Sequence, residues 1–276
     1  LKDKLGWDIN ASLVRFKPQY FVSSLRGELS GHVKTQGIWS EKLKRIDIRD
    51  LNAAGFLNNK PIRGRGNLSL LLDSNQKDFL PQQFEANNLF FAYAQNQLQA
   101  TGNAQSLKIK LNAPALYELY PGLQGRAYGS LNVQSQPRLK ATANIAVDNF
   151  AFNELASIRS LRIQGELPTS EATPTLLIAK VDHLRSGNRE IEDATINLGG
   201  TRKAHVLKVE SNNRQSNFYV QLAGGFNQNN DWLGQLQKGH FKSRRIDLVQ
   251  NQSAPIIYST AQSELYIGQH CWQSLH

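Results

Sequence analysis

The chain has 276 residues, of which 40% are hydrophobic and 20% charged, and its formal net charge is +10. The apolar fraction argues against wholesale disorder, yet no stretch approaches the ~20 uninterrupted apolar residues of a transmembrane helix. The single cysteine, Cys271, excludes a disulfide within the chain and a zinc site with two or more thiolates.

Alternation of aliphatic and polar residues is the dominant pattern. Residues 107–111 read Leu-Lys-Ile-Lys-Leu, so the aliphatic side chains share one face of a strand and the lysines the other. Turn-forming residues separate such runs about every 8–12 residues, which is typical of successive antiparallel strands. The pattern predicts an all-β chain whose sheet has one apolar face. In chain order, the other alternating runs lie at residues 46–48, 68–70, 131–133, 161–163, 196–198, 218–222 and 265–267.

Helical signals are confined to short segments. Residues 114–120 start with Pro114, which suits a helix start, and Pro121 with Gly122 would end the helix. A second candidate turn follows residues 16–18. We expect one or two short helical turns between strands.

The chain also resembles itself. Residues 24–31 and 122–129 share a unit in which Leu is followed by Gly and polar residues, and a Pro-containing segment comes before each. Stacked repeats form quasi-one-dimensional structures. We therefore predict two repeat segments, residues 1–113 and 114–276, within one continuous elongated β structure.

Methionine is absent, even at position 1. We therefore expect the chain to be a processed product or a piece of a longer protein. No basic and apolar signal peptide opens it. Any anchor or targeting segment would then lie outside these residues.

The positive charge favours anionic partners in general. The basic residues are scattered, however, and the densest cluster is Lys242, Arg244 and Arg245. Solvated strand faces and protected sheet edges explain such scattering better than a nucleic-acid surface does. Nucleic-acid binding is therefore a weaker hypothesis than the two given below, a binding groove and a closed structural segment. We expect no nucleic-acid partner.

Enzymatic chemistry has little support. The sequence has no nucleophile elbow, no zinc-protease motif and no phosphate-binding loop. Cys271 beside His270 is interpreted as part of a strand end. Asp47, Asp50 and Asp73 are dispersed and follow strand parity or turns, which argues against a carboxylate pair. We expect no catalytic residue, no metal site and no cofactor.

An apolar sheet face of this extent has to be covered, because monomers rarely expose large apolar patches. A second sheet, the fold itself, lipid or an extended client strand could cover it. The alternative to a binding groove is a closed structural β-solenoid or adhesion segment without lipid cargo. The predicted groove residues, all on alternating runs, are Leu107, Ile109, Leu111, Leu131, Val133, Ile145, Val147, Leu161, Ile163, Ile196, Leu198, Leu207, Val209, Phe218, Val220 and Leu222.

Residues 111–133 resemble the central region of the TamB proteins, the inner-membrane component of the translocation and assembly module of Gram-negative bacteria, within the AsmA-like superfamily. Residues 7–33 look like a preceding copy of the same unit. Further matches follow in order at residues 198–209, 232–236 and 271–272. The resemblance thus extends over nearly the whole chain.

The resemblance implies a long, curved, half-closed sheet, shaped like a taco, with an apolar interior groove. It implies a periplasmic location, with an inner-membrane anchor outside this chain. It also implies roles in outer-membrane protein assembly and secretion, and in lipid transport between the membranes. The implied partners are phospholipid acyl chains, a TamA-like outer-membrane barrel protein and extended client strands.

Overall fold

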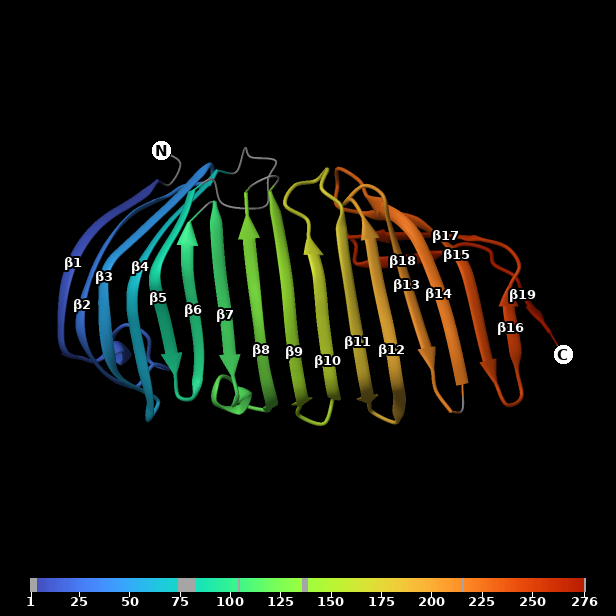
Figure 1. Ribbon diagram of the computed structural model, residues 1–276, viewed down its shortest axis with the longest axis horizontal. Helices are drawn as coiled ribbons and strands as arrows, with labels where there is room; N and C mark the ends of the chain where they lie inside the picture. Colours follow the sequence, from blue (N-terminus) through green and yellow to red (C-terminus); the bar gives the residue numbers. More distant parts are fainter. Residues whose placement is uncertain (1–3, 74–82, 104, 136–138, 215, 276) are drawn as a thin grey trace. The chain divides into compact units, whose positions relative to one another are not determined.

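The computed structural model describes residues 4–73, 83–103, 105–135, 139–214 and 216–275. These residues form 19 strands of antiparallel sheet (Figure 1). The predicted all-β fold is confirmed. The two expected helical turns are also confirmed, as the 3₁₀ helices η1 (Pro18–Tyr20) and η2 (Leu116–Glu118).

The chain divides into two compact units, unit 1 (Leu1–Thr142) and unit 2 (Ala143–His276). The predicted boundary between residues 113 and 114 separates sequence repeats rather than compact units, and it stays a prediction. The strands that begin in unit 1 are β1 (Leu5–Phe16), β2 (Gly27–Trp39), β3 (Leu43–Leu57), β4 (Lys60–Asp73), β5 (Gln83–Tyr93), β6 (Asn96–Asn103), β7 (Ser106–Ala113), β8 (Leu123–Gln134) and β9 (Lys140–Phe152). Those of unit 2 are β10 (Ala156–Leu167), β11 (Thr175–Ser186), β12 (Arg189–Gly200), β13 (His205–Asn212), β14 (Ser216–Phe226), β15 (Trp232–Ser243), β16 (Asp247–Gln250), β17 (Ala254–Ser259), β18 (Glu264–Ile267) and β19 (Trp272–Ser274).

Unit 1 is a meander in which each strand from β1 to β8 pairs with the next one in the chain. The connection between β7 and β8 contains η2. The side chain of Asn96, at the start of β6, holds this connection in place. Asn96 donates from Nδ2 to the Ala115 carbonyl at 2.9 Å and accepts from the Ala115 amide at 3.1 Å. Since Asn96 is buried, these two bonds satisfy polar groups that would otherwise be costly to bury.

Unit 2 begins as the same kind of meander and then branches. Strands β10 to β15 pair in chain order. Strand β15 then pairs with both β16 and β17, while β17 pairs with β18 and β16 with β19. The short last strands thus extend the sheet from two halves of β15.

Few large side chains are fully buried. The buried hydrophobic residues of the described chain are mostly alanines, together with Leu89, Leu107 and Val133. Ala86, Leu89 and Ala100 form one buried cluster on β5 and β6. Most larger aliphatic side chains are half-buried, so the sheet has a thin core and retains accessible apolar surface.

Bulges interrupt alternate strands of unit 1. The register shifts next to Arg15 in β1, Asp50 in β3 and Asn88 in β5, and each of these residues has a positive φ. A bulge bends its strand and increases the local twist. This accounts for the curved course of β1 to β4 in Figure 1.

Candidate functional site

The candidate site of unit 1 is an apolar face that follows from strand register. Directly paired residues of antiparallel strands point to the same side of a sheet. The register therefore defines rows of side chains that run across the eight consecutively paired strands, β1 to β8. One row consists of Ile9, Thr35, Ile48, Leu68, Ala86, Gly102, Leu107 and Val133. A second row, on the same face, consists of Leu13, Gly31, Ala53, Gly64, Phe91, Leu98, Leu111 and Gly129.

The predicted groove residues of β7 and β8 belong to this apolar face. Leu107 pairs with Val133, and Ile109 pairs with Leu131. Leu107 and Val133 are buried, at 9% and 5% exposure, whereas Leu111 is 38% exposed. The structure therefore brings these five residues together. The patch they form is buried at Leu107 and Val133 and accessible at Leu111.

Unit 2 has an apolar face of its own. One row consists of Gly165, Leu177, Leu198, Leu207, Leu222, Leu236 and Ala254. The next consists of Ile163, Ala179, Ile196, Val209, Val220 and Gly239. Leu161 and Phe218 lie on the same face, in register with Val181 and Phe241 respectively. All the groove residues predicted on β10 to β14 therefore share this face, and most are half-buried.

Strand β9 carries the last two predicted groove residues, Ile145 and Val147. Asp148 lies 2.6 Å from an Arg162 guanidinium nitrogen. Arg162 pairs with Lys180 between two apolar-face positions, so it points to the opposite face. The neighbour of Asp148, Val147, therefore points to the apolar side, and so does Ile145, which is 36% exposed.

The sequence prediction missed several members of these faces. Phe91, Leu98, Leu177 and Leu236 occupy the rows described above. Leu98 is followed by Gln99, Ala100, Thr101 and Gly102. Because Ala100 and Gly102 are small, the alternation of apolar and polar residues is weak in this strand. Pairing with Leu111 on the next strand reveals its orientation.

The opposite face of unit 1 is polar and contains a buried carboxylate. Asp47, whose side chain is 3% exposed, lies 2.8 Å from the Arg45 guanidinium. Ser69 Oγ donates to Asp47 at 2.5 Å, and Gln36 Nε2 donates at 3.3 Å. Burial acts to raise the pKa of Asp47, but the hydrogen bonds from Ser69, Arg45 and Gln36 outweigh it and leave the pKa below its ordinary value.

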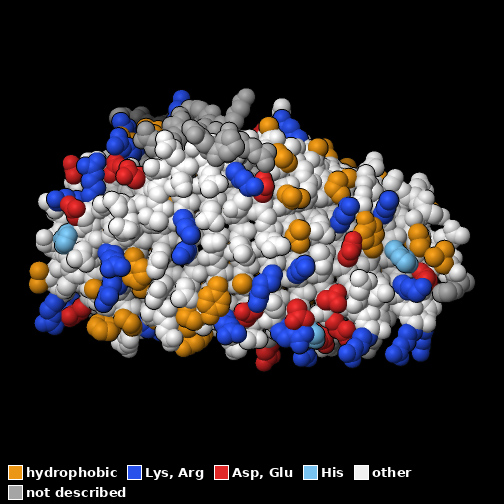
Figure 2. Space-filling model, in the orientation of Figure 1, with side chains coloured by type: hydrophobic (Ala, Val, Ile, Leu, Met, Phe, Trp, Pro, Cys, Tyr) orange, Lys and Arg blue, Asp and Glu red, His pale blue; other side chains and the backbone are white. Residues whose placement is uncertain are grey.

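The polar face of unit 2 has a similar arrangement around Asp247. Lys242 Nζ and His240 Nε2 each lie 2.8 Å from a carboxylate oxygen of Asp247. The hydrogen bonds from Lys242 and then His240 lower the pKa of Asp247. Lys242, the first member of the densest basic cluster, is therefore paired with a carboxylate. Basic side chains are scattered over the surface seen in Figure 2.

The part of the chain that the structure describes offers no cluster of three His, Cys, Asp or Glu side chains suited to a metal ion. Within the same residues, no helix has the length and apolar character needed to cross a bilayer.

The chain belongs to the class of all-β proteins built from antiparallel sheet, and the sheet of each unit has one apolar and one polar face. Over residues 1–276 the chain matches the family described as TamB, N-terminal domain. It therefore belongs to the TamB family, as the resemblance of its motifs predicted.

A curated relative is the translocation and assembly module subunit TamB of Haemophilus influenzae. The two are 25% identical over 281 aligned residues, which cover 99% of this chain and 21% of the relative. The chain thus spans about a fifth of the relative's length. No solved structure matches the chain.

Proposed function

We propose that this chain is a non-enzymatic, periplasmic segment of a TamB-type protein and that its apolar faces carry phospholipid acyl chains between the inner and outer membranes. The observation that carries the proposal is the accessibility of large aliphatic side chains on faces where the fully buried residues are mostly alanines. Acyl chains need apolar walls and no fixed polar partner, which fits rows made almost entirely of aliphatic residues, Phe and Gly.

The same faces could serve the assembly and secretion of outer-membrane proteins. An extended client strand would place alternate side chains against the apolar rows. In this proposal the protein is anchored in the inner membrane outside the present chain, and a TamA-like outer-membrane protein is its partner. The acyl-chain function is favoured because the rows carry few polar side chains that could orient a peptide.

The test compares neighbouring residues on opposite faces. Leu111→Asp and Leu198→Asp place a carboxylate on the apolar face of unit 1 and unit 2, respectively. Asn112→Asp and Asn197→Asp add the same charge on the polar faces, where Asn112 pairs with Gln97 and Asn197 with Lys208. We expect the Leu variants to lose several-fold more co-purified phospholipid than the Asn variants, because a carboxylate is costly among acyl chains.

Lipid extraction and mass spectrometry measure the phospholipid content, and circular dichroism checks that each variant is folded. Equal lipid content in all four folded variants would contradict the proposal. Unfolding of the Leu variants alone would instead identify the apolar faces as closed, dry cores. Release of bound protein fragments with unchanged lipid would identify client strands as the cargo.

A further inference from the structure

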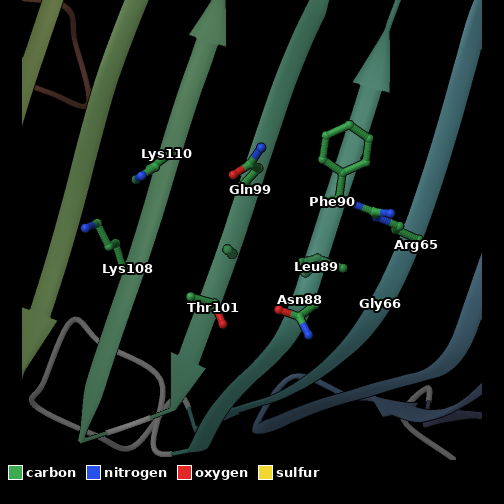
Figure 3. Close-up of a pocket in the computed structure, with 10 residues that line it drawn as sticks. Arg65, Gly66, Asn88, Leu89, Phe90, Gln99, Thr101, Lys108 and Lys110 are labelled. Atoms are coloured by element: carbon green, nitrogen blue, oxygen red, sulfur yellow. The ribbon is translucent and has the colours of Figure 1, made fainter.

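A hollow on the polar face of unit 1 carries cations without a carboxylate among its lining residues. The hollow has a volume of about 550 Å³, and its charged lining residues are Arg65, Lys108 and Lys110. Figure 3 shows the two lysines on one strand and Arg65 three strands away, with uncharged side chains between them. The hollow lies on the side of the sheet opposite the apolar face that is proposed above to hold acyl chains. A binding role of the hollow is therefore independent of that proposal.

Strand register aligns the side chains of the hollow. Arg65, Phe90, Gln99 and Lys110 are directly paired neighbours on β4, β5, β6 and β7. Lys108 pairs with Thr101 in the adjacent row. Three strand spacings separate Arg65 from Lys110, about 14 Å at the backbone. Long basic side chains can thus approach a small anion from both sides.

A bulge lies beside the hollow. Asn88 has a φ of 48°, and the register between β5 and β6 shifts between Ala86 and Leu89. Gly66 on β4 faces this bulge with a φ of 107°, and a Cβ there would lie 2.5 Å from the Asn88 carbonyl oxygen. Only glycine therefore permits this close approach of the two strands. The approach of β4 to this bulge thus depends on glycine at position 66.

Arg65 is held in place by an aromatic ring. Its guanidinium lies 5.1 Å from the centroid of Phe90. Stacking on a ring face leaves the guanidinium edge available, and this edge is suited to bidentate hydrogen bonds with an oxyanion.

The charge of the hollow differs from that of other parts of the polar face. Arg15 pairs with Glu28, Lys34 with Asp50, and Arg45 with Asp47. Among the described residues, no carboxylate pairs with Arg65, Lys108 or Lys110. The neutral donors Asn88, Gln99 and Thr101 line the same space. Three cations with several neutral donors suit a compact oxyanion that has several acceptor oxygens.

We propose that this hollow binds a phosphate-bearing anion, either free phosphate or the phosphate of a lipid headgroup. A carboxylate ligand, with only two acceptor oxygens, would leave most of these donors unused.

The test measures binding of two probes to the purified chain at low ionic strength. Inorganic phosphate is titrated by calorimetry, and vesicles of phosphatidylcholine with and without phosphatidylglycerol are tested by co-sedimentation. The variant Lys108→Gln/Lys110→Gln removes two cations of the hollow, and Arg65→Lys keeps the charge but removes the planar fork. The matched control, Lys208→Gln/Lys238→Gln, removes two exposed lysines from the polar face of unit 2.

We expect the hollow double variant to weaken binding at least about tenfold, the effect of losing about one charge-assisted hydrogen bond. Arg65→Lys should also weaken binding, and the control should change it less than about twofold. Binding of phosphate alone would identify the free anion as sufficient, whereas binding only of phosphatidylglycerol vesicles would identify a lipid headgroup.

Equal weakening by the hollow variant and the control would overturn the proposal, since bulk charge alone would then explain binding. Absence of saturable binding to both probes would also overturn it. Because the hollow variants leave the apolar face unchanged, they should retain co-purified phospholipid, so failure here is distinguishable from failure of the proposed lipid function.

Discussion

Asp47 illustrates how a single residue on the polar face connects three strands. Its carboxylate accepts hydrogen bonds from Gln36 on β2, Arg45 on β3 and Ser69 on β4. A buried charge is tolerated only when it is paired and hydrogen-bonded. These bonds therefore stabilise the register of β2, β3 and β4 as well as the charge.

Asp47→Asn should lower the free energy of unfolding by ~1–3 kcal/mol at neutral pH, because it removes charged hydrogen bonds in a buried place. Since the folded-state pKa of Asp47 is lowered, its contribution is complete above the ordinary pKa of 3.8 and is lost as the pH falls through the lower folded-state pKa. Urea unfolding across this pH range measures both effects.

The control for this experiment is Asp50→Asn. Asp50 forms an exposed ion pair with Lys34 at 3.1 Å, and both side chains are more than half exposed. Such pairs contribute less than about 1 kcal/mol. If Asp47→Asn were no more destabilising than Asp50→Asn, or kept the full acid dependence, the role given to the Asp47 carboxylate would be wrong.

The face on which a residue lies was predictable where alternation was strict. Leu107, Ile109 and Leu111 alternate with lysines, and the structure places them on one face. The partners of Asp47 could not be predicted, because Gln36 and Ser69 approach it only through pairing between strands far apart in sequence. Residues on a face can thus be read locally, whereas polar networks require the register.

At the scale of the strand, the close approach of a neighbouring backbone decides which positions require glycine. Gly165 in β10 has a φ of +145°, and an added Cβ would lie 1.9 Å from the Leu176 carbonyl oxygen. Gly199 in β12 has no atom within 4 Å of the same position. The two glycines, both in unit 2, therefore form a matched pair.

Gly165→Ala should lower the free energy of unfolding by ~1–3 kcal/mol, the cost of a strained backbone position. Gly199→Ala should be neutral or stabilise by up to about 1 kcal/mol, because alanine reduces the entropy of the unfolded chain. Thermal or urea unfolding of both variants decides the matter. Similar free energies of unfolding for the two variants would show that the close approach of the Leu176 backbone does not require glycine at position 165.

The strands were predictable from the sequence, but their bulges were not. An alternating run predicts a strand and its faces, as in residues 107–111. A bulge at Asn88 adds one residue to one strand and so reverses the parity of everything beyond it. Nothing local to residues 86–89 distinguishes this insertion from ordinary alternation. The bulge beside the proposed phosphate-binding hollow is therefore visible only in the structure.

At the scale of the whole molecule, each unit combines an apolar face with a polar face. Apolar rows run across β1 to β8 in unit 1 and across β10 to β15 in unit 2. Most of their large side chains are half-buried. When successive strands all place apolar side chains on the same face, the sheet presents a continuous apolar surface across many strands.

The apolar faces were predicted from the sequence, and their occupant was inferred from the family resemblance. Alternation requires that something cover the face, but acyl chains, a client strand and a second sheet satisfy that pattern equally. The division into units near residue 142 left no compositional signal, because the alternation continues through residues 140–148.

Photo-crosslinking to lipid in cells tests directly whether the apolar faces hold phospholipid. A photoreactive amino acid replaces Leu111 or Leu198 on the apolar faces, or the adjacent Asn112 or Asn197 on the polar faces. We expect crosslinked phospholipid at the two Leu positions and little at the two Asn positions. Equal crosslinking on both faces, or none at Leu111 and Leu198 in the folded protein, would contradict it.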